Sequence, residues 1–138
     1  MRGGLSISWI GIIIHYLIRM SDIFSYNGGS IVAMRGKDSV SLGCDRRLGQ
    51  QFATLATDFQ RVFKIQDNIL LGLSGLASDI ETFKNTLLYK TNLFRLREQR
   101  DMKARTFMNL VSTSLYEKRF GPFFVTPIVV GLDKAYRL

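Results

Sequence analysis

The order of the predicted elements indicates an α+β fold with an antiparallel sheet. Short alternating or apolar runs occupy residues 27–73, a helical period follows over 78–118, and an apolar run returns at 127–131. Strands followed by long helices and a further strand are typical of layered α+β folds, and tight turns favour antiparallel pairing. The chain has 138 residues, 46% hydrophobic and 22% charged, which fits one globular domain.

The first strands are predicted to form hairpins. Residues 31–35 are apolar and rich in β-branched side chains, and 39–44 alternate between apolar and small side chains. The turn residues 36–38 join them over a length that favours a hairpin. A second pair of strands is predicted over 51–57, which alternates weakly, and 61–65.

The next strand is predicted to be buried. Turn chemistry at 66–68 leads into 69–73, a short and continuous apolar run of the kind found in buried strands. The last strand, 127–131, has no obvious partner in the sequence.

Two helices are predicted between these strands. Ser78 and Glu81 form a capping-box pattern, in which a hydroxyl and a carboxylate satisfy free backbone N–H groups at a helix start. A second helix is predicted over 105–118, ended by Gly121 and Pro122. The side chains expected to face the core are Ile80, Phe83, Leu87, Thr91 and Phe94 in the first helix and Phe107, Leu110, Val111, Ser114 and Leu115 in the second.

Several residue types are too scarce for common kinds of site. Cys44 is the single cysteine, which excludes an internal disulfide and a multi-cysteine zinc site. His15 is the single histidine and lies outside the predicted domain, which excludes a Ser-His or Cys-His pair and a histidine metal site there. We therefore expect no metal and no cofactor.

The formal charge of +8 raises nucleic acid as a partner. The basic residues between Lys84 and Arg105 are interrupted by Glu98 and Asp101, and no aromatic residues alternate with them in the manner of base-stacking surfaces. We expect the charge to be spread over solvated faces, with no nucleic-acid partner.

Residues 1–19 form an apolar N-terminal extension that we expect to lie outside the fold. The apolar run from Leu5 to Ile18 is shorter than the ~20 residues of a transmembrane helix. Its basic start suits a signal peptide, but no small-x-small cleavage site follows it. We expect Met20 to be the usual start and 20–138 to be the domain, so that a membrane is involved only if 1–19 is a genuine signal.

Five blocks in order resemble proteasome beta subunits, which belong to the N-terminal-nucleophile hydrolase superfamily. The block 116–123 is the most specific, and with 127–133 it is most similar to the beta type-3 group. The blocks are Asn27 to Gly29, Gly43 to Arg47, Leu71 to Asp79, Tyr116 to Phe123 and Pro127 to Asp133.

The resemblance implies a four-layer αββα sandwich with antiparallel sheets, here a partial domain because the family domain continues well past the last block. We therefore expect unpaired strand edges and an exposed apolar face.

Active members of the family use the amine and hydroxyl of an N-terminal threonine, which an aspartate and a lysine assist. The resemblance places Gly29 at the threonine, Asp45 at the aspartate and Arg61 at the lysine. Gly75 matches the glycine whose N–H helps to stabilise the oxyanion. Glycine has no hydroxyl and arginine is no proton shuttle, so these residues form a vestigial pocket with no catalytic residue. Ser30 lies one residue out of register and would point to the opposite face.

The resemblance therefore implies a non-catalytic structural subunit of the proteasome core in cytoplasm and nucleus. Its partners would be neighbouring alpha and beta subunits in stacked rings. An active threonine- or serine-type peptidase subunit, a basic nucleic-acid-binding module and a membrane-anchored product stay as alternatives. A plain structural ion pair is the competing interpretation of Asp45 and Arg61. Arg46 and Arg47 fit either a solvated turn or a subunit contact.

Overall fold

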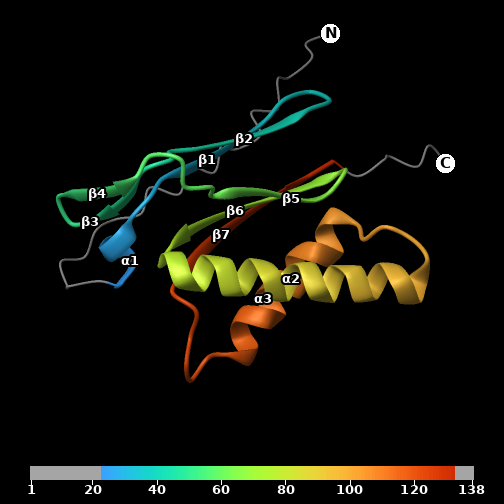
Figure 1. Cartoon of the computed structure of the whole chain (residues 1–138). Helices are drawn as coiled ribbons and strands as arrows, with labels where there is room; N and C mark the ends of the chain where they lie inside the picture. The colour runs from blue at the N-terminus through green and yellow to red at the C-terminus, as the bar shows by residue number, and fades with distance from the viewer. Residues whose placement is uncertain (1–22, 133–138) are drawn as a thin grey trace, which may run out of the picture.

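The computed structural model describes residues 23–132, so the extension 1–19 and Met20 lie outside the described residues. Figure 1 shows a three-stranded sheet with two long helices beneath it and a hairpin above it. The elements are α1 (Ile23–Asn27), β1 (Ile31–Arg35), β2 (Val40–Cys44), β3 (Leu48–Gln50), β4 (Ala53–Ala56), β5 (Val62–Gln66), β6 (Ile69–Gly75), α2 (Ala77–Glu98), α3 (Ala104–Glu117) and β7 (Val125–Gly131).

The central sheet has the order β5-β6-β7, and both pairings are antiparallel. The middle strand β6 carries Ile69, Leu71 and Leu73, which are all fully buried. Strand β7 pairs with β6 over its whole length, from Ile69 opposite Gly131 to Gly75 opposite Val125. The expectation that residues 127–131 lack a partner was therefore wrong. The partner strand precedes both helices in the sequence, so no local pattern reveals it.

Helices and hairpin cover opposite faces of this sheet. In Figure 1, α2 and α3 lie below β6 and β7, while the β1–β2 hairpin crosses above them. Gly72 permits the close approach of the hairpin, because a side chain there would collide with Ile31 and press on Leu42. The predicted antiparallel α+β architecture and the first hairpin are confirmed.

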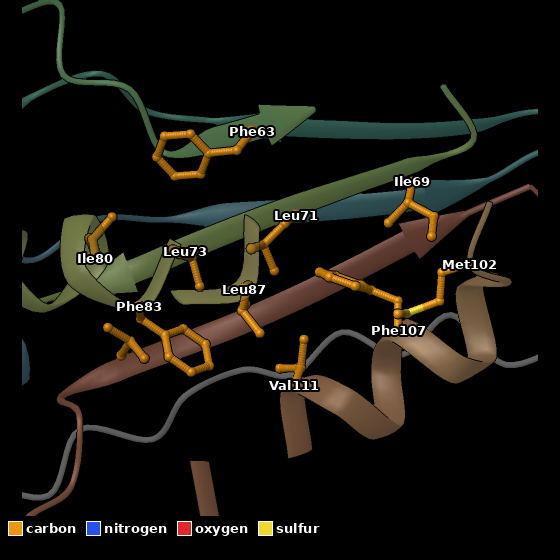
Figure 2. Close-up of a cluster of buried hydrophobic side chains, with 11 residues drawn as sticks. Phe63, Ile69, Leu71, Leu73, Ile80, Phe83, Leu87, Met102, Phe107 and Val111 are labelled. Carbon is orange, nitrogen blue, oxygen red and sulfur yellow. The ribbon is translucent and has the colours of Figure 1, made fainter. Parts of the chain in front are cut away.

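The core fills the space between the sheet and the two helices (Figure 2). The predicted stripe of the first helix is confirmed, since Ile80, Phe83, Leu87 and Thr91 are buried and Phe94 packs against the cluster. Each fully buried apolar side chain of this size contributes about 1.5–3 kcal/mol. In α3 the buried residues are Phe107, Val111 and Ser114, with Leu110 and Leu115 partly buried.

The predicted pairing of the second pair of strands, 51–57 with 61–65, was wrong. Strand β4 pairs with β3, which the sequence did not indicate, and β5 pairs with β6 through the turn at 67–68. Strand β3 has only three residues, Leu48–Gln50, of which one is glycine. So short a strand has no alternation that would distinguish it from a loop.

The predicted capping box was also wrong. Helix α2 begins at Ala77, and its N-cap residue Leu76 makes no side-chain hydrogen bond. The cap comes instead from Asn27, which lies far away in the sequence. Its Oδ1 accepts a hydrogen bond from the backbone N–H of Ala77 at 3.0 Å. Asp79 in the first turn accepts from the backbone N–H of Phe124 at 2.8 Å. A tertiary contact thus satisfies the first N–H group of the helix, and Asp79 holds the Phe124 backbone beside the same turn.

No helix within residues 23–132 combines the length and the apolar character needed to cross a bilayer.

Candidate functional site

The candidate site lies where β1 begins, β2 ends and β5 begins. The backbone N–H of Ser30 donates to Asp45 Oδ1 at 2.6 Å, and the N–H of Asp45 donates to the Ser30 carbonyl at 3.2 Å. These bonds extend the β1–β2 ladder beyond its last pair, Ile31 with Cys44. The ladder therefore holds the Asp45 carboxylate directly beside residues 29 and 30.

Arg61 provides the positive charge of the site from a fully buried position. Its Nε lies 3.5 Å from Asp45 Oδ1, and its Nη2 donates to the Arg47 carbonyl at 2.8 Å. The guanidinium carbon also lies 5.0 Å from the ring centroid of Phe59. A buried guanidinium needs a counter-charge and hydrogen-bond acceptors; Asp45 and the Arg47 carbonyl supply these in part, while Nε and Nη1 make no hydrogen bond within residues 23–132. The ion pair that the sequence left open for Asp45 and Arg61 is present.

Gly29 lies directly against this guanidinium. A Cβ atom at residue 29 would lie 2.6 Å from Arg61 Nη1 and 2.7 Å from Nε, well inside van der Waals contact. The φ angle of Gly29 is +125°, which side-chain-bearing residues rarely adopt. Any side chain here would displace a buried charged group, so Arg61 fills the space that a nucleophile at this position would require.

Gly75 ends β6 at the same end of the sheet. The N–H of Leu73 donates to the Arg61 carbonyl at 2.8 Å, which sets the end of β6 beside the start of β5. A Cβ at Gly75 would collide with the carbonyl oxygen of Phe124, and the φ of Gly75 is +122°. The structure thus brings Gly29, Asp45 and Arg61 into contact, while the nearest neighbours of Gly75 on its Cβ side are Phe124 and Val125.

Two polar side chains that the sequence did not assign to the site support it. Arg47 donates from Nε to Thr54 Oγ1 at 3.0 Å and from Nη2 to the Ala53 carbonyl at 3.1 Å. It therefore closes the β3–β4 turn from an exposed position, which fits the solvated turn that the sequence offered as one alternative. Asn27 donates from Nδ2 to the Gly49 carbonyl at 3.1 Å. Together with its bond to Ala77, this contact anchors the segment that leads into Gly29.

The chemistry available to this arrangement is limited to electrostatics. Gly29 offers no oxygen, sulfur or side-chain nitrogen, and Arg61 stays protonated at working pH. Asp45 is engaged by an N–H group and a guanidinium. Among residues 23–132 no three histidine, cysteine, aspartate or glutamate side chains are grouped as they would be around a metal ion. Residue 29 therefore carries no reactive group, and the Asp45–Arg61 ion pair lies beside it.

Comparison with known proteins identifies the family. Residues 25–138 match the model of the proteasome subunit family, "Proteasome subunit". The match covers most of the chain, so the chain belongs to the proteasome subunit family.

The most similar relatives found are all beta type-3 subunits. Proteasome subunit beta type-3 of Oryza sativa subsp. japonica is 56% identical over 112 residues, covering 81% of this chain and 55% of the relative. The subunits of Drosophila melanogaster and Saccharomyces cerevisiae are 49% and 48% identical over 111 and 114 residues, covering 80% and 83% of this chain and 54% and 55% of the relatives. The chain thus spans about half the length of the curated relatives that it matches.

Proposed function

We propose that this chain acts as a non-catalytic, structural beta subunit of the proteasome core particle. The observation that carries the proposal is the contact between Gly29 and Arg61. Residue 29 has no nucleophile, and the guanidinium occupies the space beside it. A threonine-type peptidase needs an N-terminal hydroxyl with a group that can take its proton, and Gly29 and Arg61 provide neither.

The similarity to beta type-3 subunits supports the structural role. In this proposal the partners are neighbouring alpha and beta subunits in stacked rings, in the cytoplasm and nucleus. The complete domain would be a four-layer αββα sandwich, in which α2 and α3 would form one helical layer, β5-β6-β7 the sheet next to it and the β1–β2 hairpin part of the second sheet. Binding free energy between subunits, and not chemistry, would be the contribution of this chain to protein degradation.

The direct test uses the full chain, tagged at its C-terminus and purified from its own cells. Native mass spectrometry should find it together with proteasome alpha and beta subunits. N-terminal sequencing should find Gly29 still joined to Gly28. Recovery of the chain alone would contradict the assembly role, and a new N-terminus at Gly29 or Ser30 would contradict the non-catalytic role.

A further inference from the structure

The end of α3 and the turn after it present aromatic and basic side chains to solvent. Every residue from Tyr116 to Pro122 is exposed, and in Figure 1 this segment leads away from the sheet before the chain returns to β7. Phe120 is 90% exposed and Tyr116 is 66% exposed. Single exposed apolar residues are common on protein surfaces, but here two aromatic rings share one arginine. We call residues 116–122 the Arg119 turn.

Arg119 is held against both rings. Its guanidinium carbon lies 4.3 Å from the ring centroid of Phe120 and 5.5 Å from that of Tyr116, and its Nη1 donates to Tyr116 Oη at 2.7 Å. The backbone is fixed as well, because the N–H of Arg119 donates to the Tyr116 carbonyl at 3.1 Å and that of Gly121 to the Lys118 carbonyl at 3.0 Å. Binding to side chains that are already held in place costs less conformational entropy than ordering mobile ones.

The Arg119 turn has a positive charge that the described part of the chain does not neutralise. Glu117 is its only acidic residue, and the Glu117 carboxylate forms an ion pair with Lys90 of α2 at 3.0 Å. Lys118 and Arg119 form no ion pair with a carboxylate within residues 23–132. The guanidinium of Arg119 therefore stays available to a carboxylate from outside, while its ring contacts hold it in one orientation.

The composition of the Arg119 turn fits a contact between proteins. Tyrosine and arginine are enriched among the residues that dominate binding free energy, and phenylalanine is enriched at interfaces in general. A partner that covers the turn removes the Arg119 guanidinium from water, so this charge then needs a counter-charge. The surface that fits is apolar where it meets Phe120 and carries a carboxylate where it meets Arg119. Such complementarity also fixes the orientation of the partner.

We propose that the Arg119 turn binds a neighbouring proteasome subunit at a surface with apolar side chains around one aspartate or glutamate. Phe120 packs among the apolar side chains, and Arg119 donates parallel hydrogen bonds to the carboxylate. The membership of the chain in the proteasome subunit family favours another subunit as the occupant. This inference rests on the structural role proposed above and assigns one surface to that role.

The test compares variants of the full chain, tagged at its C-terminus and purified from its own cells. Native mass spectrometry of a dilution series measures the concentration at which half of the tagged chain is released from other subunits. Phe120→Ala and Arg119→Glu should each raise this concentration about tenfold or more, as expected for residues central to an interface. The matched controls Tyr89→Ala and Arg97→Glu alter an exposed aromatic and an exposed basic residue of α2. They should change it less than about twofold.

The carboxylate of the partner is tested with a carbodiimide, which joins an amine to a carboxylate in contact with it. The variant Arg119→Lys keeps the positive charge and supplies the amine. Peptide mapping by mass spectrometry should find residue 119 of this variant linked to one aspartate or glutamate of a single alpha or beta subunit.

The possible failures have different meanings. Recovery of the unaltered chain without other subunits would contradict the structural role, and this inference with it. Normal recovery, with equal effects of the turn variants and their controls, would overturn the inference alone. A link from residue 119 to a second copy of this chain would overturn it in favour of self-association. Binding to phosphatidylserine vesicles that Phe120→Ala abolishes, with subunit recovery unchanged, would identify a membrane surface instead. Circular dichroism of each variant establishes that the helices are retained.

Discussion

At residue 29 the missing side chain and the buried guanidinium form a single packing arrangement. Arg61 keeps its position through the Arg47 carbonyl and Asp45, and its Nη1 and Nε face the place where a Cβ would be. The resemblance to proteasome beta subunits pointed to Gly29, Asp45 and Arg61 and left an ion pair of the last two open, but the close approach of the guanidinium to residue 29 was not visible in the sequence. Residues 29 and 61 come into contact only because the start of β1, the end of β2 and the start of β5 lie together in the fold.

This packing predicts a measurable coupling between residues 29 and 61. Gly29→Ala should destabilise the chain by about 2–4 kcal/mol, through positive φ and through overlap with the guanidinium. In an Arg61→Lys background the shorter head group should relieve part of that cost, giving a coupling free energy of about 1 kcal/mol in a urea-unfolding double-mutant cycle. Gly28→Ala is the matched control, because Gly28 has positive φ but no atom within 4 Å of its Cβ position. Equal coupling for both glycines would contradict the overlap.

Glu81 on α2 should titrate below its ordinary range. A hydrogen bond from Lys84 is the main cause that lowers the pKa of Glu81 from 4.5, with a second bond from Asn85. Since the folded-state pKa is lowered, the stabilisation by this pair is present above about pH 4.5 and is lost as the pH falls through the lowered pKa. An NMR titration that follows the carboxyl carbon of Glu81 should give a midpoint below 4.5. The substitution Lys84→Met should return this midpoint towards 4.5. An unchanged midpoint in the variant would exclude Lys84 as the cause.

At the scale of elements, Asn27 connects three parts of the chain. Its amide joins the end of α1 to β3 through Gly49 and to the start of α2 through Ala77. A capping box at Ser78 was predicted because the local pattern was complete, but the acceptor in the structure comes from another element. Sequence patterns reveal helix ends that are capped locally and miss those that are capped across the fold.

Asn27→Ala should therefore weaken α2 at its first turn. The loss of two hydrogen bonds, one of them at a helix N-terminus, should cost about 1–2 kcal/mol. Hydrogen exchange should show the Ala77 amide exchanging faster, while amides in the middle of α2 are affected less. Asn109→Ala on the exposed side of α3 is the control and should stay within about 0.5 kcal/mol. Equal effects of the two substitutions would argue against a capping role for Asn27.

The elements with strong periodicity were those that the sequence predicted well. The stripe of Ile80, Phe83 and Leu87 placed α2 correctly, and the turn at 36–38 placed the first hairpin. The short α1 and β3 were missed because three to five residues carry no usable period. The pairing of β7 with β6 was missed because two helices separate the strands.

At the scale of the whole molecule, the hairpin layer has one covered face and one open face. Ile31 and Leu42 pack towards the central sheet, whereas Val32 and Met34 are 65% and 70% exposed on the outer face of β1. Open apolar surface on a small sheet is typical of a place where further protein packs.

Polar substitution of the open face should raise solubility without loss of stability. Val32→Thr/Met34→Thr should lower the light scattering of concentrated samples and change the free energy of unfolding by less than about 0.5 kcal/mol. Leu42→Thr on the covered face is the matched control, expected to cost about 2 kcal/mol because it removes an apolar contact with β6. Comparable destabilisation by both changes would mean that the outer face is already covered.

The position of β7 at the end of the described chain determines when β6 can complete its pairing during synthesis. A ribosome adds about 5–20 residues per second, so several seconds separate the synthesis of β6 from that of Gly131 at the end of β7. During that interval the second edge of β6 has no strand to pair with, and α2 and α3 emerge before β7 is complete. The nascent chain therefore passes through a stage at which β6, with Ile69, Leu71 and Leu73, is paired on one edge only. Chaperones that bind such edges would have their main opportunity on this protein in those seconds.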